Sequence, residues 1–338
     1  MLVLDGSFGE GGGQIVRTAL TLSMITGTPF RIENVRANRK KPGLLRQHLT
    51  CVTAAKAITH AKVTGADLGS AAFTFTPGHI RGGGYDLAIG SAGSTALVFQ
   101  TIFPALLCAN EPSHVTLSGG THNKSAPTFD YLDHVFLPLV RRMGASAEIT
   151  MHKAGFYPAG GGSWHADINP AQKLTPLVLE EAGALKRRAI VADVANIGID
   201  VAKREAKMAA GLMSWPGDTM QWRTVKAEGQ GNVIAIYIEH ENICEIFTGF
   251  GARNVSAEAV AAQAADEARS YIACGAPVGP HLADQLLLPM ALASGGSFST
   301  CVPTGHTRTN AAVIEKFLPV EIGIEPDGHK SWRVSITS

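Results

Sequence analysis

The chain has 338 residues, of which 45% are hydrophobic and 17% are charged, and its formal net charge is +1. This composition excludes a disordered chain and predicts a well-packed protein, long enough for two domains or for one large core with an insertion. A net charge this close to zero excludes broad, non-specific coating of nucleic acid, but it leaves open the recognition of a short RNA or of a nucleotide.

The N-terminus, the cysteines and the most apolar segment together predict a cytoplasmic protein. The opening residues "MLVLDGSFGEGGG" contain no basic region followed by an apolar core, so we expect no signal peptide. The five cysteines are scattered and form no Cys-x-x-Cys pair, which predicts reduced thiols. The segment "ALVFQTIFPALLCA" is short and contains Gln100, Thr101 and Pro104, which indicates a buried helix and not a membrane span.

One order of elements recurs three times along the chain. A glycine-containing turn, an apolar helix, a short break and a strand are predicted in residues 11–36, 90–120 and 281–303. A second helix then follows each strand, in residues 41–58, 125–144 and 305–319. Further strands are expected in residues 72–80, 144–157 and 320–336. Three copies of a β-sheet-plus-two-helices unit predict an α+β architecture in which helix pairs cover one face of each sheet.

A different segment, residues 183–275, separates the second copy from the third. Its strands are expected at 187–198, 220–227, 232–241 and 243–251, and its helices at 200–214 and 256–273. This pattern predicts a small α/β domain inserted into a larger one, which then comprises residues 1–182 and 276–338.

A carboxylate stands in the glycine-rich turn before the first predicted helix, in "FGEGGGQIVR". Glycines allow a backbone to approach a phosphate, and Mg²⁺ is commonly held by one carboxylate together with nucleotide phosphates, so Glu10 is a candidate metal ligand. A flexible strand-to-helix turn is the alternative interpretation. The dinucleotide fingerprint is excluded because position 14 is Gln, and "GGTHNKS" lacks the glycine that a Walker A motif has before Lys124.

A basic run follows, with Arg31, Arg36, Arg39, Lys40, Lys41 and Arg46. We expect a helix to open within it at Pro42. Arginines beside a helix N-terminus are poorly placed unless an anion balances them, so a phosphate-bearing substrate is one interpretation of this run. A solvated surface is the other.

Other sequence patterns argue against a serine hydrolase and against a structural zinc site. "GSAGS" has Ala92 at its centre, which excludes the serine elbow of a hydrolase. The chain has no His-Glu-x-x-His and no paired metal-ligand spacing, which argues against a structural zinc site. In "GPHLADQLLLPMAL", Asp284 and Gln285 stand at a predicted helix start, where Asp284 is expected to cap the helix.

The segment "PTGHTRTNAAVIEKFLP" places His306 after a glycine and immediately before a helix, with threonines suited to capping. The positive end of the helix dipole disfavours an imidazolium and favours a bound anion such as phosphate. By itself this pattern is typical of a polar turn residue as well as of a nucleophile that attacks a phosphate.

The chain resembles the RNA 3′-terminal phosphate cyclase family in six segments that occur in one order: "GEGGGQIVRTALTLSMITG", "KPGLLRQHL", "GSAGS", "FYPAGGG", "ADQLLLPMALA" and "GHTRTNAAVIEKFLP". The resemblance covers nearly the whole chain. It implies a large domain of three repeats similar to the C-terminal domain of translation initiation factor 3, with a small inserted α/β domain.

The resemblance also implies an enzyme that uses ATP with Mg²⁺ or Mn²⁺. ATP adenylylates a histidine, AMP passes to the 3′-phosphate end of an RNA, and the neighbouring 2′-hydroxyl closes a 2′,3′-cyclic phosphate. On this resemblance His306 is the nucleophile and Glu10 the metal ligand. The ATP contacts are Gln100, Pro127, His281, Leu282, Ala283, Asp284 and Gln285. The expected RNA contacts are Arg17, Arg36, Arg39, Arg46 and Gln47.

Two positions depart from the family pattern. His281 stands where the family generally has a tyrosine that stacks on adenine, and Ala154 stands where a histidine or arginine usually precedes the glycine of "FYPAGGG". Two other functions are alternatives: a non-catalytic relative that assists ribosome assembly, which would lack the nucleophile, and an enolpyruvyl-class transferase, which would form no adenylylated intermediate. The presence of His306 favours the cyclase, with RNA 3′-phosphate ends and ATP as partners and no membrane.

Overall fold

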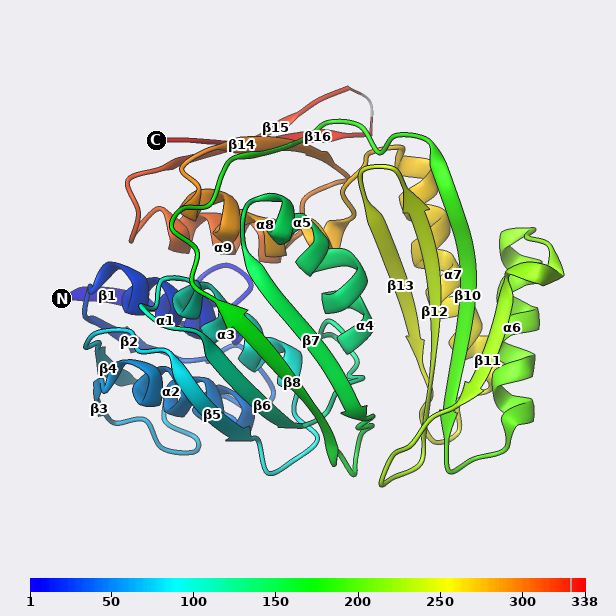
Figure 1. Ribbon diagram of the computed structural model, residues 1–338, viewed down its shortest axis with the longest axis horizontal. Helices are drawn as coiled ribbons and strands as arrows, with labels where there is room; N and C mark the ends of the chain where they lie inside the picture. The colour runs from blue at the N-terminus through cyan, green and yellow to red at the C-terminus, as the bar shows by residue number, and fades with distance from the viewer. Residues whose placement is uncertain (329) are drawn as a thin grey trace.

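Four four-stranded sheets organise the chain in the computed structural model, which describes residues 1–328 and 330–338 (Figure 1). Helices pack against these sheets, which gives a mixed α/β architecture that is compatible with the predicted α+β class. The first sheet has the strand order β1-β2-β4-β3. Its elements are β1 (Leu2–Asp5), α1 (Gln14–Thr26), β2 (Phe30–Glu33), α2 (Arg46–Thr59), β3 (Lys62–Thr64) and β4 (Phe73–Thr76).

The second sheet has the order β5-β6-β8-β7. Its elements are β5 (Gly83–Ala88), α3 (Thr95–Leu107), β6 (Ser113–Gly119), α4 (Phe129–Tyr131), the π-helical segment η1 (Leu132–Phe136), α5 (Leu137–Arg142), β7 (Ser146–Lys153) and β8 (Gly162–Asn169). The apolar helix α3 is buried against the inner face of this sheet, where the indole of Trp164 donates a hydrogen bond to Thr95 Oγ1 at 2.7 Å.

The third sheet has the order β15-β16-β14-β9. Its elements are β9 (Leu177–Leu179), α8 (Pro280–Leu292), β14 (Gly296–Thr300), α9 (Gly305–Ile314), β15 (Glu321–Pro326) and β16 (Trp332–Thr337). The predicted strand 320–336 is thus two antiparallel strands, and His329 within it lies outside the described residues.

These three sheets share one connectivity. In each, the first strand is parallel to the second, and the fourth strand lies antiparallel between the second and the third. A parallel pair needs a crossover connection, which α1, α3 and α8 provide. Sequence patterning predicted these helices but missed the first strand of each sheet, because β1, β5 and β9 are short and carry no clear alternation of apolar and polar residues.

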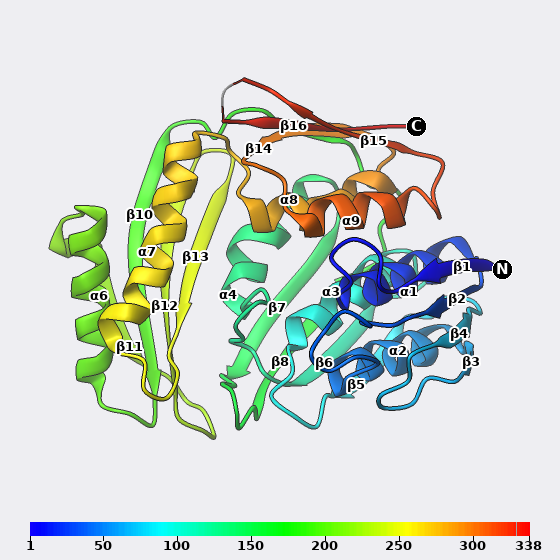
Figure 2. The ribbon, with the colours of Figure 1, turned by 180° about the vertical axis from the view of Figure 1, so that it is seen from behind.

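The fourth sheet forms within the crossover between β9 and β14. Its order is β11-β10-β12-β13, and α6 and α7 cover one of its faces (Figure 2). The elements are β10 (Leu185–Ala195), α6 (Ile199–Met213), the 3₁₀ turn η2 (Gly217–Thr219), β11 (Met220–Thr224), β12 (Gly231–His240), β13 (Cys244–Phe250) and α7 (Ala257–Cys274). Alanines of α6 and α7 pack on isoleucines of β10 and β12, while the opposite face, with Val191, Tyr237 and Ile246, joins the core of the other three sheets. All six elements predicted for this segment are confirmed.

Two predicted helix starts are wrong. Helix α2 begins at Arg46 and not at Pro42, because Gly43 adopts a φ of +75° and its N–H bonds to Val35 O, a turn that a helix cannot contain. Helix α8 begins at Pro280 after Gly279, so Asp284 lies a full turn inside it and does not cap it.

The prediction of reduced thiols is wrong for one pair of cysteines. Cys274 at the end of α7 and Cys301 after β14 form a disulfide, with their Cα atoms 5.8 Å apart. The fold brings the two together across 27 residues, which spacing along the chain could not indicate. Cys51, Cys108 and Cys244 are free thiols.

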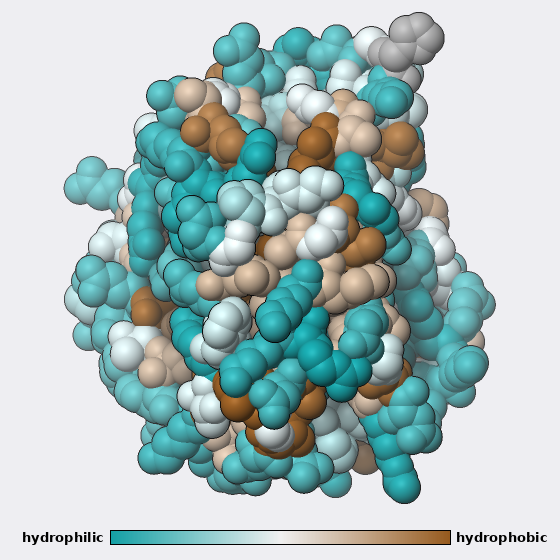
Figure 3. Space-filling view, turned by 90° about the vertical axis from the view of Figure 1, so that its right-hand side faces the viewer, coloured by the Kyte–Doolittle hydropathy of each residue, from teal (hydrophilic) through white to brown (hydrophobic). Residues whose placement is uncertain are grey.

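The surface beside α6 is mainly hydrophilic with small separate hydrophobic patches, as the side view shows (Figure 3). Across residues 1–328 and 330–338, no helix combines the length and the apolar character that crossing a membrane requires.

A buried carboxyl group joins the fourth sheet to α8. Glu245 on β13 is 1% exposed, and its Oε1 accepts a hydrogen bond from the N–H of Gly279 at 2.6 Å. Burial raises the pKa of Glu245 from 4.5 to about 8. The native state therefore holds a proton at neutral pH that the unfolded chain releases.

We expect Glu245→Gln to change the pH dependence of stability. As the pH rises from about 5 to 8, the free energy of unfolding of the wild type should fall relative to that of the variant, by at most about 1.4 kcal/mol per pH unit. The reason is that only the wild type must hold this extra proton to fold. Below the unfolded pKa the difference should level off. Urea unfolding at a series of pH values measures it, and parallel curves for the two proteins would contradict the assignment.

Candidate active site

His306 is the second residue of α9, at a helix start that is capped by its own sequence. The hydroxyl of Thr304 accepts a hydrogen bond from the N–H of Thr307 at 3.2 Å, which fixes the first turn. The imidazole is half exposed. The expected helix after the glycine is confirmed, but its cap is Thr304, which precedes Gly305, and not one of the threonines after His306, and His306 lies within the first turn of the helix and not before it.

Two side chains from the beginning of the chain hold the imidazole. His306 Nδ1 lies 3.0 Å from Gln14 Oε1, and Nε2 lies 3.3 Å from Glu10 Oε1. The other end of the Gln14 amide, Nε2, donates to Asp284 Oδ1. Because the amide oxygen can only accept, the hydrogen-bond network assigns a proton to Nδ1 of His306 and directs Nε2 toward the glycine turn.

Asp284 anchors this arrangement from α8. Burial raises its pKa, and the nearby His306 opposes the rise. The backbone carbonyl of Asp284 accepts from the Asn310 amide at 3.0 Å, and Asn310 Oδ1 accepts from Thr18 at 2.7 Å. Helices α1, α8 and α9, which lie beside one another in Figure 2, are therefore joined by one polar network under the imidazole.

Arg39 and Thr309 hold Glu10 beside the His306 imidazole. A guanidinium nitrogen of Arg39 contacts both Glu10 Oε1 and the Glu10 carbonyl oxygen, the latter at 3.0 Å. The backbone N–H of Glu10 donates to Thr309 Oγ1 at 3.0 Å. The sequence placed Arg39 with the RNA contacts, and in the structure its guanidinium pairs with the candidate metal ligand.

Close packing explains two of the glycines in this turn. A Cβ at Gly9, whose φ is +54°, would lie 2.3 Å from Thr309 Oγ1, and a Cβ at Gly13 would lie 2.0 Å from His48 Nε2. His48 is buried and accepts from the N–H of Leu45 at 3.1 Å through Nδ1. Burial lowers the pKa of His48 to about 3, so this imidazole is neutral and acts as a rigid support for the turn.

We expect Gly13→Ala to destabilise the protein by about 1–3 kcal/mol, because the buried His48 ring cannot move away from the new methyl group. Gly211→Ala is the matched control, since a Cβ there meets nothing within 4 Å and lies inside α6, where alanine stabilises a helix by about 0.5–1 kcal/mol. Thermal or urea unfolding compares the two, and equal effects would show that His48 does not support the turn.

The residues expected at the nucleotide lie mainly along α8. Gln100 of α3 donates to Gln285 at 2.5 Å, and Gln285 donates to the carbonyl oxygen of His281 at 3.1 Å. The exposed His281 faces Glu267 at 3.7 Å, a contact that raises the pKa of His281. Leu282 and Ala283 are buried, so their side chains belong to the core. Pro127 is half-buried in the connection between β6 and α4.

The side chains expected to contact the RNA differ in their surroundings. Arg36 donates to the carbonyl oxygens of Lys41 and Gly43, which ties its guanidinium to the loop before α2. Arg17 is largely buried, which lowers its pKa. Arg46 is exposed at the first residue of α2, and Gln47 beside it accepts from the N–H of Ser94 at 2.8 Å.

The site has features that fit a phosphate chain and a divalent metal ion. Helix α1 begins after Gly13 with no side-chain cap, which leaves the N–H groups of its first turn available to an anion. Gly305 lies beside Glu10 Oε2, which is 4.0 Å from where a Cβ on this glycine would stand. A single carboxylate next to a phosphate site suits Mg²⁺.

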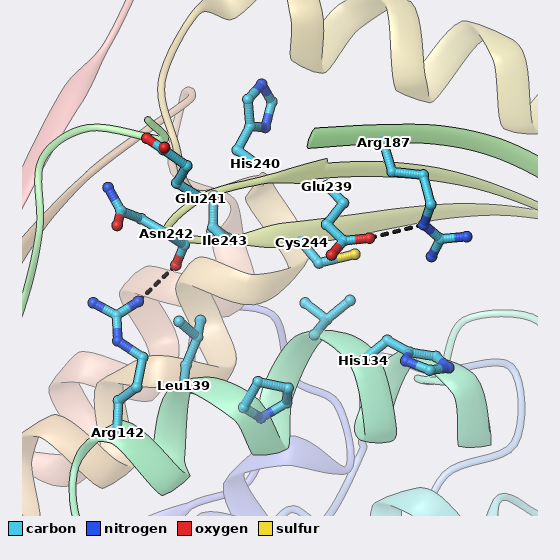
Figure 4. Close-up of a pocket in the computed structure, with 12 residues that line it drawn as sticks. His134, Leu139, Arg142, Arg187, Glu239, His240, Glu241, Asn242, Ile243 and Cys244 are labelled. Atoms are coloured by element: carbon cyan, nitrogen blue, oxygen red, sulfur yellow. Dashed lines mark hydrogen bonds and ion pairs between the residues drawn. The ribbon is translucent and has the colours of Figure 1, made fainter. Parts of the chain in front are cut away.

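A cleft of about 570 Å³ lies elsewhere, between η1–α5 and the strands β10, β12 and β13 (Figure 4). Arg142 donates to the Asn242 carbonyl oxygen across it, and Arg187 pairs with Glu239 at 2.8 Å on its far wall. None of the residues predicted from the sequence to bind ligands lines this cleft.

Comparisons with known proteins agree with one another. The sequence model of a family described as RNA 3′-terminal phosphate cyclase matches residues 8–324. A protein of that name from Koribacter versatilis (strain Ellin345) is 49% identical over 97% of this chain and 92% of its own length. Proteins of the same name from Ralstonia nicotianae and Ectopseudomonas mendocina are 51% and 48% identical, over 96% and 98% of this chain and 93% and 97% of their own lengths.

Proposed function

The chain belongs to the RNA 3′-terminal phosphate cyclase family and is an enzyme of that family, and on this premise we propose that it uses ATP to convert an RNA 3′-terminal phosphate into a 2′,3′-cyclic phosphodiester. A terminal phosphate monoester has no good leaving group. Adenylylation turns it into a mixed anhydride from which AMP departs readily, and a covalent enzyme–AMP intermediate divides this activation into two manageable steps.

The orientation of the His306 imidazole is the observation that carries the proposal. Gln14 accepts from Nδ1, so Nε2 is the nitrogen that faces the glycine turn, where it lies 3.3 Å from Glu10 Oε1. Nε2 attacks the α-phosphorus of ATP in line with the departing pyrophosphate, and a P–N bond forms as the P–O bond breaks. Asp284 acts through Gln14 as a positioning residue that keeps the ring in this tautomer.

Glu10 is the proposed ligand of Mg²⁺, which offsets negative charge on the phosphates when it is bound. The start of α1 and the Arg39 guanidinium are the proposed contacts of the phosphate chain. Adenine is assigned to the surface formed by Gln100, Pro127 and residues 281–285, where the imidazole of His281 offers less stacking area than a tyrosine.

AMP then passes from His306 to the RNA 3′-phosphate, and the 2′-hydroxyl attacks the activated phosphorus and releases AMP. The proposed RNA contacts are Arg17, Arg36, Arg39, Arg46 and Gln47, of which Arg46 is exposed and free to move. Closure of the ring needs orientation more than chemical assistance, because the hydroxyl is already tethered beside the phosphorus.

We also propose the division of the chain that this assignment implies. Residues 1–182 and 276–338 form a catalytic domain of three repeats similar to the C-terminal domain of translation initiation factor 3, and residues 183–275 form an inserted α/β domain. The shared connectivity of three sheets and the separate alanine-rich core around α6 and α7 support it.

Substituting the terminal 2′-hydroxyl tests the proposed reaction. With ATP and Mg²⁺, an RNA ending in a 3′-phosphate should be converted to a 2′,3′-cyclic end, whereas the same RNA with a terminal 2′-deoxynucleotide should stop at the adenylylated end. Gel analysis of labelled RNA separates these products. Cyclisation without ATP, or none with the ribonucleotide end, would contradict the proposal.

Glu10→Gln tests the role of the carboxylate. The variant should lose about a hundredfold in the rate of AMP transfer, comparable to the removal of one electrostatic stabiliser, while its thermal stability stays close to that of the wild type. Single-turnover transfer from labelled ATP, measured over a range of Mg²⁺ concentrations, determines the rate. A folded variant with wild-type transfer would exclude Glu10 as the metal ligand.

A further inference from the structure

A cluster of three histidines and an aspartate lies on the outer face of the second sheet, outside the candidate active site. His165 and Asp167 are two residues apart on β8, so they share one face of the sheet. The buried residues Trp164, Ala166 and Ile168 alternate with them, which directs both toward solvent. On the neighbouring strand β6, shown beside β8 in Figure 1, His114 lies directly opposite Asp167.

The side chains of this cluster already converge. His114 Nδ1 is 2.7 Å from Asp167 Oδ1, and His165 Nε2 is 3.5 Å from Asp167 Oδ2. One ligand atom from each of the three residues lies within 4.8 Å of the others. The rings of His114 and His165 have their centroids 4.9 Å apart.

These distances match the requirements of a small tetrahedral coordination site. With metal–ligand bonds of about 2.0–2.1 Å, neighbouring ligands of a tetrahedron are about 3.3 Å apart. His114 Nδ1 and His165 Nε2 lie 2.7 Å and 3.5 Å from the two different oxygens of Asp167, distances that bracket this value, and side-chain rotation can bring both imidazoles to one metal ion. Two imidazoles and one carboxylate leave the fourth position to water.

A third histidine, His152, orients His165. His152 at the bulged end of β7 places its Nε2 2.7 Å from His165 Nδ1. If His165 offers Nε2 to a metal ion, its Nδ1–H donates to His152, the kind of outer hydrogen bond that holds most metal-binding histidines in place. The carboxylate of Glu148, opposite Asp167 on β7, adds negative charge to the same face.

We propose that His114, His165 and Asp167 bind a divalent transition metal ion of the zinc class, with His152 as a positioning residue. Imidazole nitrogens with one carboxylate suit Zn²⁺ and its neighbours, whereas Mg²⁺ prefers an all-oxygen set. The site links β6 to β8 across the face of the sheet. Its ligands come from residues 114 to 167, a separation that no short sequence motif describes.

Zn²⁺ binding to the full-length protein tests the proposal independently of the cyclase reaction. After treatment with a chelator and buffer exchange, the protein is titrated with Zn²⁺ against a coloured competing chelator, with excess Mg²⁺ present to occupy hard-cation sites. The wild type should bind one equivalent at this site. His152→Ala should weaken that binding about 10–100-fold, the range for outer hydrogen-bond partners, and His165→Ala and Asp167→Asn should weaken it more.

Two matched controls should retain the wild-type affinity: His79→Ala, which removes an exposed histidine elsewhere, and Cys108→Ser, which removes an exposed thiol. Wild-type Zn²⁺ affinity in both His165→Ala and Asp167→Asn would overturn the proposal. Loss of the bound Zn²⁺ equivalent in Cys108→Ser, or displacement of that Zn²⁺ by Mg²⁺, would also overturn it. Circular dichroism verifies that each variant is folded, and Asp167→Asn provides a variant of unchanged shape. Cu²⁺ bound to the wild type should show nitrogen couplings in its electron paramagnetic resonance spectrum that His165→Ala diminishes.

Discussion

The amide of Gln14 connects the two residues on which the rest of the candidate active site depends, the partly buried carboxylate of Asp284 on α8 and the exposed imidazole of His306 on α9. An amide offers a donor at one end and an acceptor at the other, so its orientation is set by the carboxylate and in turn sets the tautomer of the histidine. Burial of Asp284 makes this contact costly to lose, since a buried carboxyl group without a partner destabilises a protein. The imidazole is thereby presented with Nδ1 bonded to Gln14 and with Nε2 facing the Glu10 carboxylate and the glycine turn.

The shared connectivity of three sheets makes this contact geometrically feasible. Gln14 and His306 are 292 residues apart, yet each begins a helix in a unit of the same β-α-β-α-β-β order. Helix α1, the first helix of one unit, and helix α9, the second helix of another, meet with their N-terminal turns side by side. The glycine turn with Glu10 and the capped turn with His306 therefore face one another. Both turns present backbone N–H groups where anions bind favourably.

Much of the fold and of the candidate site could be predicted from the sequence, because it depends on residues close together in the chain. The glycine turn around Glu10, the helix start at His306 and the strands and helices between residues 185 and 274 follow from spacing, capping residues and apolar periodicity. The partners of those residues could not be predicted. The contact of Arg39 with Glu10 and that of Gln14 with Asp284 join residues that are 29 and 270 positions apart in the chain. Asp284 was expected to cap α8 but lies inside it, because the helix begins at Pro280. The roles of Gln14, Thr309 and Asn310, the Cys274–Cys301 disulfide and the histidine cluster on β6 and β8 likewise depend on residues distant in the chain.

The central claim is that Nε2 of His306 carries AMP during the reaction. Incubation with α-labelled ATP and Mg²⁺, followed by proteolysis and mass spectrometry of the labelled peptide, identifies the modified residue, and phosphorus resonance distinguishes the two ring nitrogens. The account predicts an acid-labile, comparatively base-stable P–N bond to Nε2 of His306, and no label on the His306→Ala protein. Label on a lysine such as Lys124, or label that persists in His306→Ala, would contradict it.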